Sequence, residues 1–132
     1  MKLKPGAGVV MRDRNGKFLL QLRDNRKNIP DPNKWGLFGG GIKEGELPID
    51  TVIREMKEEL ELKLKKEDLS LEYTYNHHKH YLFLYKKTID PTKLKLHEGQ
   101  AFGLFSRMQI IFMKGVALRT RLFFIFHNFN RN

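Results

Sequence analysis

The sequence predicts an α/β or α+β sandwich, a fold in which helices pack against a β-sheet. Three observations support this prediction. Strand-like apolar runs occupy much of the chain before residue 106, one segment in between repeats its apolar residues at helical spacing, and a weaker helical pattern follows Arg107. The length of 132 residues suits one domain, because domains most often contain about 100–150 residues. We therefore expect a single domain over residues 1–132.

The N-terminal part is expected to form a β-hairpin and a further strand. Residues 8–11 and 17–22 are apolar, strand-like runs. Between them, residues 13–16 end in Asn-Gly, which tolerates the positive φ that tight hairpin turns require. A polar loop over residues 24–34 then leads to a short strand over 35–38, which ends at a run of three glycines.

The strongest helical signal lies in residues 48–62. Five apolar residues follow the i, i+3, i+4, i+7, i+11 spacing of one helix face: Ile49, Val52, Ile53, Met56 and Leu60. Pro48 suits the first turn, where its missing N–H costs no hydrogen bond. We expect later strands at about 69–75, 80–86 and 102–105, with a loop over 91–100 before the last, and a helical tail from Arg107 that is interrupted near Gly115.

The net charge and the amino-acid composition exclude several classes of functional site and partner. The chain has 25 Lys+Arg and 15 Asp+Glu, a net charge of +10, and it has no cysteine. The absence of cysteine excludes disulfides, thiolate metal sites and thiol nucleophiles. No apolar run follows the N-terminal lysines, and residues 122–126 fall far short of the ~20 apolar residues that span a bilayer. We expect a cytoplasmic protein without membrane contact whose partner is anionic.

One acidic segment stands out in this basic chain. Residues 35–69 contain six Lys/Arg and nine Asp/Glu. Within it, Glu55, Glu58 and Glu59 occupy successive turns of one helix face, where like charges repel. A divalent cation would reverse that repulsion, because Mg²⁺ prefers oxygen ligands. The alternative is a solvated helix face that forms the i, i+4 pairs Arg54–Glu58 and Glu59–Lys63.

The neighbourhood of these glutamates resembles the signature of the Nudix (MutT-type) hydrolases, G-x5-E-x7-R-E-U-x-E-E-x-G-U, where U is a bulky aliphatic residue. Eight of its nine positions match, and they are Gly40, Glu46, Arg54, Glu55, Met56, Glu58, Glu59 and Leu62. Glu61 stands where the family has glycine, so we expect the helix to run on or to end differently there. The resemblance implies a Nudix-type α/β/α sandwich with a mixed β-sheet between helices.

The resemblance also implies an activity, namely hydrolysis of a nucleoside diphosphate linked to another group, with Mg²⁺ or Mn²⁺ as cofactor. The implied metal ligands are Glu55, Glu58, Glu59, the Gly40 carbonyl and Glu98, which lies in a late Glu-Gly-Gln loop. Arg54 would hold the glutamates in place through ion pairs. Glu55 and Glu98 are both candidates for the general base, although Glu98 is equally consistent with an exposed loop residue.

Further residues are candidates for binding substrate: Arg23, Trp35, Gly39, Gly40 and Glu46. The basic residues Arg23, Arg26, Lys27 and Lys34 suit either substrate phosphates or a solvated surface, and Trp35 suits either the core or a base-stacking platform. Glu46 would support its loop or bind metal through water.

Other residues that attract attention have simpler interpretations. The histidines His77, His78 and His80 fit the polar side of a strand better than a magnesium site. The tail residues Phe123, Phe124, Phe126 and Phe129 are interpreted as packing, with a dimer interface as a second role.

Two other function classes compete with the hydrolase. One is a catalytically silent Nudix-fold module that binds a nucleotide or an RNA 5′ end, and the complete set of glutamates argues against it. The other is a general nucleic-acid binder, which the net charge suggests but the dispersed basic residues do not. The resemblance favours a nucleotide-type small molecule as substrate over capped or triphosphorylated RNA. We expect the protein to be a monomer or a homodimer.

Overall fold

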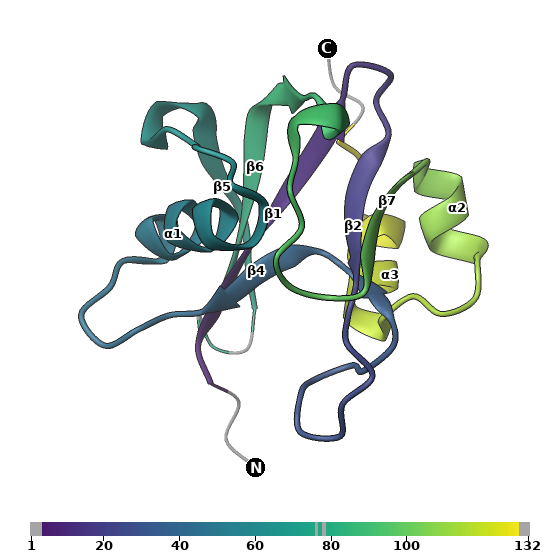
Figure 1. The fold of residues 1–132 in the computed structure, drawn as a ribbon, viewed down its shortest axis with the longest axis horizontal. Helices are drawn as coiled ribbons and strands as arrows, with labels where there is room; N and C mark the ends of the chain where they lie inside the picture. Colours follow the sequence, from purple (N-terminus) through teal and green to yellow (C-terminus); the bar gives the residue numbers. More distant parts are fainter. Residues whose placement is uncertain (1–3, 76, 78, 130–132) are drawn as a thin grey trace.

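A seven-stranded mixed β-sheet lies between α1 on one face and α2 with α3 on the other (Figure 1). The computed structural model describes residues 4–75, 77 and 79–129. The strands are β1 (Gly6–Asp13), β2 (Phe18–Leu22), β3 (Trp35–Gly36), β4 (Phe38–Gly41), β5 (Leu69–Tyr75), β6 (His80–Ile89) and β7 (Ala101–Phe105). The helices are α1 (Pro48–Leu60), α2 (Arg107–Phe112) and α3 (Leu118–Phe126), with single 3₁₀ turns η1 (Lys66–Asp68) and η2 (Pro91–Lys93). This arrangement confirms the expected α/β/α sandwich.

Strand β1 organises the sheet because it has three partners. It pairs in parallel with β6 along most of its length, and its first half pairs antiparallel with β4. Only its end meets β2, through Arg12 and Phe18, so the predicted hairpin opens and β2 pairs instead with β7 and β3. Because β1 diverges from β2, β4 can pair with β1. In this position β4 contacts α1, the helix that follows it in the chain.

The strand expected over residues 35–38 is divided in two. Trp35–Gly36 pairs with β2, whereas Phe38–Gly41 pairs with β1, and Leu37 lies between them. The glycine run belongs to β4 and lies very close to β1, since a Cβ on Gly39 would lie 2.3 Å from the Ala7 carbonyl oxygen. A glycine is therefore required for this strand pairing.

Helix α1 packs its apolar stripe on one face of the sheet, as predicted. Val52, Met56 and Leu60 are fully buried there. The helix ends at Leu60, two residues earlier than expected, because Glu61 adopts a left-handed conformation with φ 53°. The Glu61 N–H donates to Lys57 and the Leu62 N–H donates to Met56, which closes the helix as a glycine cap would.

The opposite face carries a second core. Val10, Phe18 and Leu20 from β1 and β2 pack there with Ile110 of α2 and Phe124 of α3. The helical tail is interrupted at Gly115, as predicted, where φ is 79°.

The four tail phenylalanines divide between core and surface. Phe123, Phe124 and Phe129 are buried, which confirms their packing role. Phe126 does not pack in the core, because it lies near the end of α3 and is 77% exposed, and its role at a dimer interface stays a prediction.

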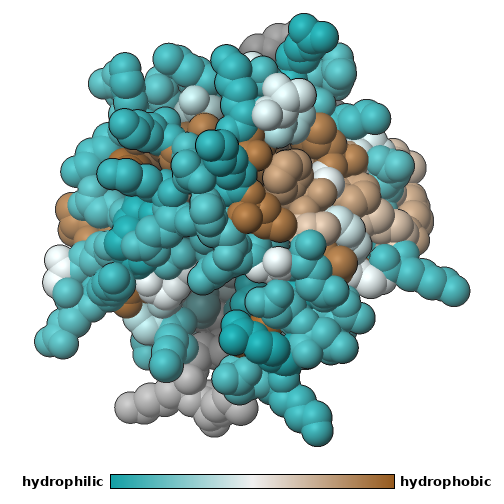
Figure 2. Space-filling view, in the orientation of Figure 1, coloured by the Kyte–Doolittle hydropathy of each residue, from teal (hydrophilic) through white to brown (hydrophobic). Residues whose placement is uncertain are grey.

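Apolar side chains also reach the surface beside α2. Figure 2 shows them on the side of the molecule where Figure 1 places this helix, and Met108 and Phe112 are exposed there. Among the described residues, no helix combines the length and apolar character needed to cross a membrane.

Candidate metal centre and adjoining cleft

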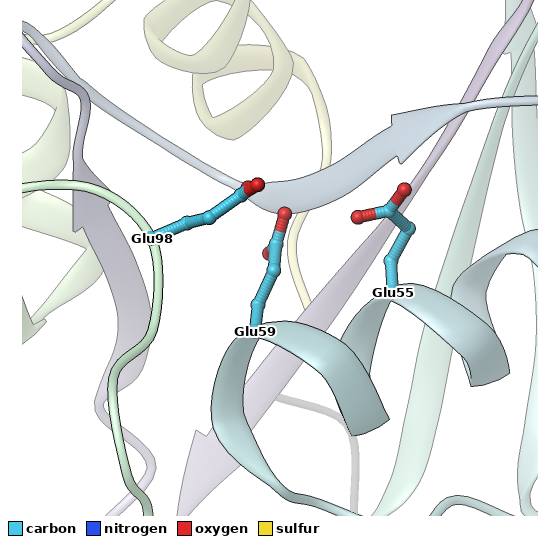
Figure 3. A group of neighbouring side chains, drawn as sticks. All are labelled: Glu55, Glu59 and Glu98. Atoms are coloured by element: carbon cyan, nitrogen blue, oxygen red, sulfur yellow. The ribbon is translucent and has the colours of Figure 1, made fainter.

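Three glutamates meet between α1 and the loop that precedes β7. Glu55 and Glu59 lie one turn apart on α1, and their side chains point toward Glu98 of the loop (Figure 3). One carboxylate oxygen from each residue lies within 4.8 Å of the other two. Three carboxylates at this separation offer the oxygen ligands that Mg²⁺ and Mn²⁺ prefer.

Glu59 is the most unusual member of this cluster. Its side chain is buried, with only 3% exposed, so it does not belong to a solvated helix face. Burial, together with the nearby carboxyl groups of Glu98 and Glu55, raises the pKa of Glu59 to about 10. Its Oε2 atom is buried and has no hydrogen-bond partner. Ionising a carboxyl group in such a buried place is costly, and so is leaving its oxygen without a partner; a bound divalent cation would lower both costs. The residues present therefore fit a metal ion.

Arg54 donates hydrogen bonds to three carboxylates, those of Glu46, Glu55 and Glu58. Its Nε and Nη2 donate to the two oxygens of Glu46 at 2.8 and 3.0 Å, and its Nη1 donates to Glu55 at 2.9 Å and Glu58 at 3.3 Å. These contacts raise the pKa of Arg54, and they contribute to lowering the pKa of Glu46 to about 2. Because Nη2 also donates to the Gly41 carbonyl, Arg54 connects strand, loop and helix.

Glu46 and Glu58 lie outside the three-glutamate cluster. The carboxylate of Glu46 accepts hydrogen bonds from Arg54, the Thr51 hydroxyl and the Lys43 N–H, so it supports its loop. Glu58 forms the expected i, i+4 pair with Arg54, and its side chain is 56% exposed. Its role as a metal ligand stays a prediction.

The Glu98 loop is held by residues that the sequence analysis did not single out for a role. The Gln21 side chain, buried in β2, donates from Nε2 to the Glu98 carbonyl at 3.1 Å. Gly99 has φ 83°, and a Cβ there would lie 2.8 Å from the same Nε2. Gln21 carried no sequence signal of its own, because a glutamine in a strand is ordinarily a surface residue.

A cleft of about 1090 Å³ adjoins the cluster. Glu55, Glu59 and Glu98 line it, as do the predicted substrate residues Arg23, Gly39 and Gly40. The wall formed by β5, β6 and the end of α3 is aromatic and includes Tyr73, Tyr75, His80, Phe123 and His127. Acidic and aromatic groups therefore share one cavity.

Other predicted residues lie elsewhere. Trp35 packs edge-on against Phe105, with 4.9 Å between ring centroids, and is not among the residues that line the cleft, which favours its core interpretation. His77 occupies a turn with φ 56°, and His78 lies outside the described residues. Over residues 4–75, 77 and 79–129, the glutamate cluster is the only group of three metal-binding side chains.

Known proteins share this fold. The family model of the NUDIX domain matches residues 2–119, while a search of curated proteins gave no match. The fold is similar to that of a MutT protein from Methanosarcina mazei Go1, with a TM-score of 0.75 and 23% identity over 95% of this chain and 94% of that chain.

Two further solved structures are similar. A MutT NUDIX hydrolase from Burkholderia pseudomallei has a TM-score of 0.64 and 21% identity, over 94% of this chain and 98% of that chain. An Ap4A hydrolase from C. elegans has a TM-score of 0.54 and 25% identity, over 80% of this chain and 83% of that chain. With the family match extending over most of its length, and with the signature residues Glu55 and Glu59 gathered beside Glu98, the chain belongs to the Nudix hydrolase family.

Proposed function

We propose that the protein is a divalent-metal-dependent pyrophosphohydrolase that cleaves a nucleoside diphosphate linked to another group. The observation that carries this proposal is the unpaired, buried Oε2 of Glu59 beside the carboxylates of Glu55 and Glu98. A protein that used these groups only for stability would be expected to pair or replace them, because an unpaired buried carboxylate oxygen is destabilising.

Glu55, Glu59 and Glu98 would hold Mg²⁺ or Mn²⁺, with the Gly40 carbonyl and Glu58 as further candidate ligands. A bound cation would neutralise charge on the phosphoryl oxygens and make water a stronger nucleophile. Arg54 fixes the carboxylate of Glu55 through Oε1, which leaves Oε2 for the cation or for the proton of the attacking water. Glu98 is the other candidate base.

Hydrolysis of the pyrophosphate bond requires only the substrate and water as reactants. Water adds its oxygen to one phosphorus of the pyrophosphate while the bridging P–O bond breaks. The proton passes to Glu55 or Glu98, and the bridging oxygen leaves with the second phosphate. Arg23 lines the same cleft and supplies a positive charge for the substrate phosphates.

The aromatic wall of the cleft supports a nucleotide substrate. The Tyr75 ring stacks on His80 with 5.0 Å between centroids and 11° between planes, and the guanidinium of Arg119 lies 5.4 Å from the Tyr75 centroid. The buried Nε2 of His80 has no hydrogen-bond partner. A nucleobase bound against this wall would contact aromatic rings, which favour stacking, and would meet the polar Nε2 of His80.

The test is a panel of nucleoside triphosphates, dinucleoside polyphosphates, ADP-ribose and nucleotide-sugars, assayed with Mg²⁺ for released phosphate with and without an added phosphatase, against samples that lack the protein. We expect turnover that depends on the cation and falls at least about 100-fold in Glu59→Gln. Glu67→Gln, which removes an equal charge from exposed η1, is the control. Tight binding of nucleotides without any turnover would contradict the proposal and favour the catalytically silent module.

A further inference from the structure

The side chains of Glu61 and His97 are hydrogen-bonded to each other between the end of α1 and the loop that carries Glu98. His97 Nε2 lies 2.6 Å from Glu61 Oε2. This contact holds the pKa of Glu61 below its ordinary value. Glu61 makes the contact from a left-handed backbone with φ 53°, a conformation that favours glycine. A glycine would cap the helix without strain, but it would have no carboxylate to offer His97.

The backbone of the loop follows the same edge of the helix. The Lys95 N–H donates to the Leu60 carbonyl at 3.1 Å, and the His97 N–H donates to the Glu59 carbonyl at 2.8 Å. Carbonyls in the last turn of a helix have no partner within the helix. The loop supplies partners here, so residues 95–97 lie against the last turn of α1 immediately before Glu98.

The far side of the loop is anchored to β2. Gln21 donates to the Glu98 carbonyl, and the Gln100 N–H donates to the Leu22 carbonyl at 2.9 Å. Glu98 is therefore held between two attachments. On the α1 side the attachment includes one pair of side chains, Glu61 and His97.

The attachment of the loop to α1 opposes repulsion within the three-glutamate cluster. Carboxylates must lose their protons to bind a metal ion, and once Glu59 and Glu98 are both ionised, like charges at this separation repel each other. Glu98 is exposed on a loop, whereas Glu59 is buried on a helix. Repulsion between them would therefore displace the loop rather than α1.

We propose that the Glu61–His97 pair positions Glu98 against Glu55 and Glu59, so that the three carboxylates keep the separation that a cation needs. The proposal rests on the metal site of the proposed function. Both residues act through Glu98 and are positioning residues, since neither belongs to the three-glutamate cluster.

The first test compares Glu61→Gly with wild type and with the control Glu67→Gln. Mn²⁺ affinity is measured by calorimetric titration, and amide hydrogen exchange at His97 reports on the loop without metal. We expect Glu61→Gly to weaken Mn²⁺ binding about 10-fold and to speed exchange at His97. The melting temperature of the metal-free protein should be unchanged or higher, because glycine relieves the left-handed backbone.

A second set of variants separates positioning from a general loss of structure. Glu61→Gln keeps an acceptor for His97 and should restore most of the Mn²⁺ affinity. His97→Ala should weaken binding as Glu61→Gly does, and the double variant should be no weaker than either single one, because the two residues act as a unit.

The two proposals can fail separately. Wild-type affinity and wild-type exchange in Glu61→Gly would overturn the positioning role while leaving the metal site intact. A fall in Mn²⁺ affinity accompanied by an equal fall in metal-free stability would also overturn it. A wild-type protein that binds no Mn²⁺ would overturn both proposals.

Discussion

A methyl group on Gly40 would lie 2.3 Å from Cδ of Glu55. The carboxylate of Glu55 therefore lies directly against the backbone of β4, in space that any other residue at position 40 would fill. The absence of a side chain at Gly40 is therefore what leaves room for the Glu55 carboxylate. Arg54 Nη1 donates to Oε1 of the same carboxylate at 2.9 Å.

Replacement of Gly40 by alanine should displace the Glu55 carboxylate. We expect Gly40→Ala to lower kcat by about 10- to 100-fold, the usual range when the support of a metal-site residue is lost. Gly41→Ala is the matched control, because a Cβ there would lie 3.9 Å from its nearest neighbour, the Pro5 carbonyl oxygen. Equal rates in both variants would show that the contact with Glu55 does not matter for activity.

Much of the fold could be predicted because its elements carry local signals. The apolar stripe of α1 has helical spacing, and the Asn15-Gly16 turn requires a positive φ, which the structure shows at Gly16. The division of residues 35–41 between two partners carried no local signal. It depends on where β1 and β2 separate, which is a property of the whole sheet.

The candidate site was predictable where a motif spans it. Glu55 and Glu59 lie one helical turn apart in the sequence, so their neighbourhood follows from the helix. Glu98 is far along the chain and joins them only through the path of its loop. Gln21 and the Glu61–His97 pair act through that loop, and single residues at such distances leave no pattern in one sequence.

Glu59 should make the stability of the metal-free protein dependent on pH. Its folded pKa is raised to about 10 from an ordinary value of 4.5. A carboxyl with a raised folded pKa contributes stability that is complete below the unfolded pKa and is lost as pH rises toward the folded one. The melting temperature measured with a chelator should therefore fall between about pH 5 and pH 9, and it should fall less in Glu59→Gln.

Cation binding should reverse this loss. We expect added Mg²⁺ to raise the melting temperature of the wild-type protein more at about pH 8 than at about pH 5, where protons compete for the carboxylates. The same addition should have a smaller effect on Glu59→Gln. Identical Mg²⁺ responses in the two proteins would contradict the assignment of Glu59 to the metal site.

Arg54→Lys should damage the site although it keeps the charge. A lysine has no planar fork and cannot bind both oxygens of Glu46 while it also contacts Glu55. We expect kcat to fall about 10- to 100-fold and the melting temperature to fall as well. Arg14→Lys, in the exposed hairpin turn, should change neither quantity. Wild-type kinetics in Arg54→Lys would show that positive charge alone suffices.

Tyr75→Leu should weaken recognition of the base without affecting chemistry at the phosphates. Stacking of a base on an aromatic side chain contributes about 1–3 kcal/mol, so we expect KM for a nucleotide substrate to rise about 10-fold while kcat changes little. Inhibition by inorganic pyrophosphate, which has no base, should be unaffected. Tyr85→Leu is the control, because Tyr85 packs against the core beneath α1 and is not among the residues that line the cleft. Equal changes in nucleotide and pyrophosphate binding would show that Tyr75 supports the cleft as a whole rather than the base.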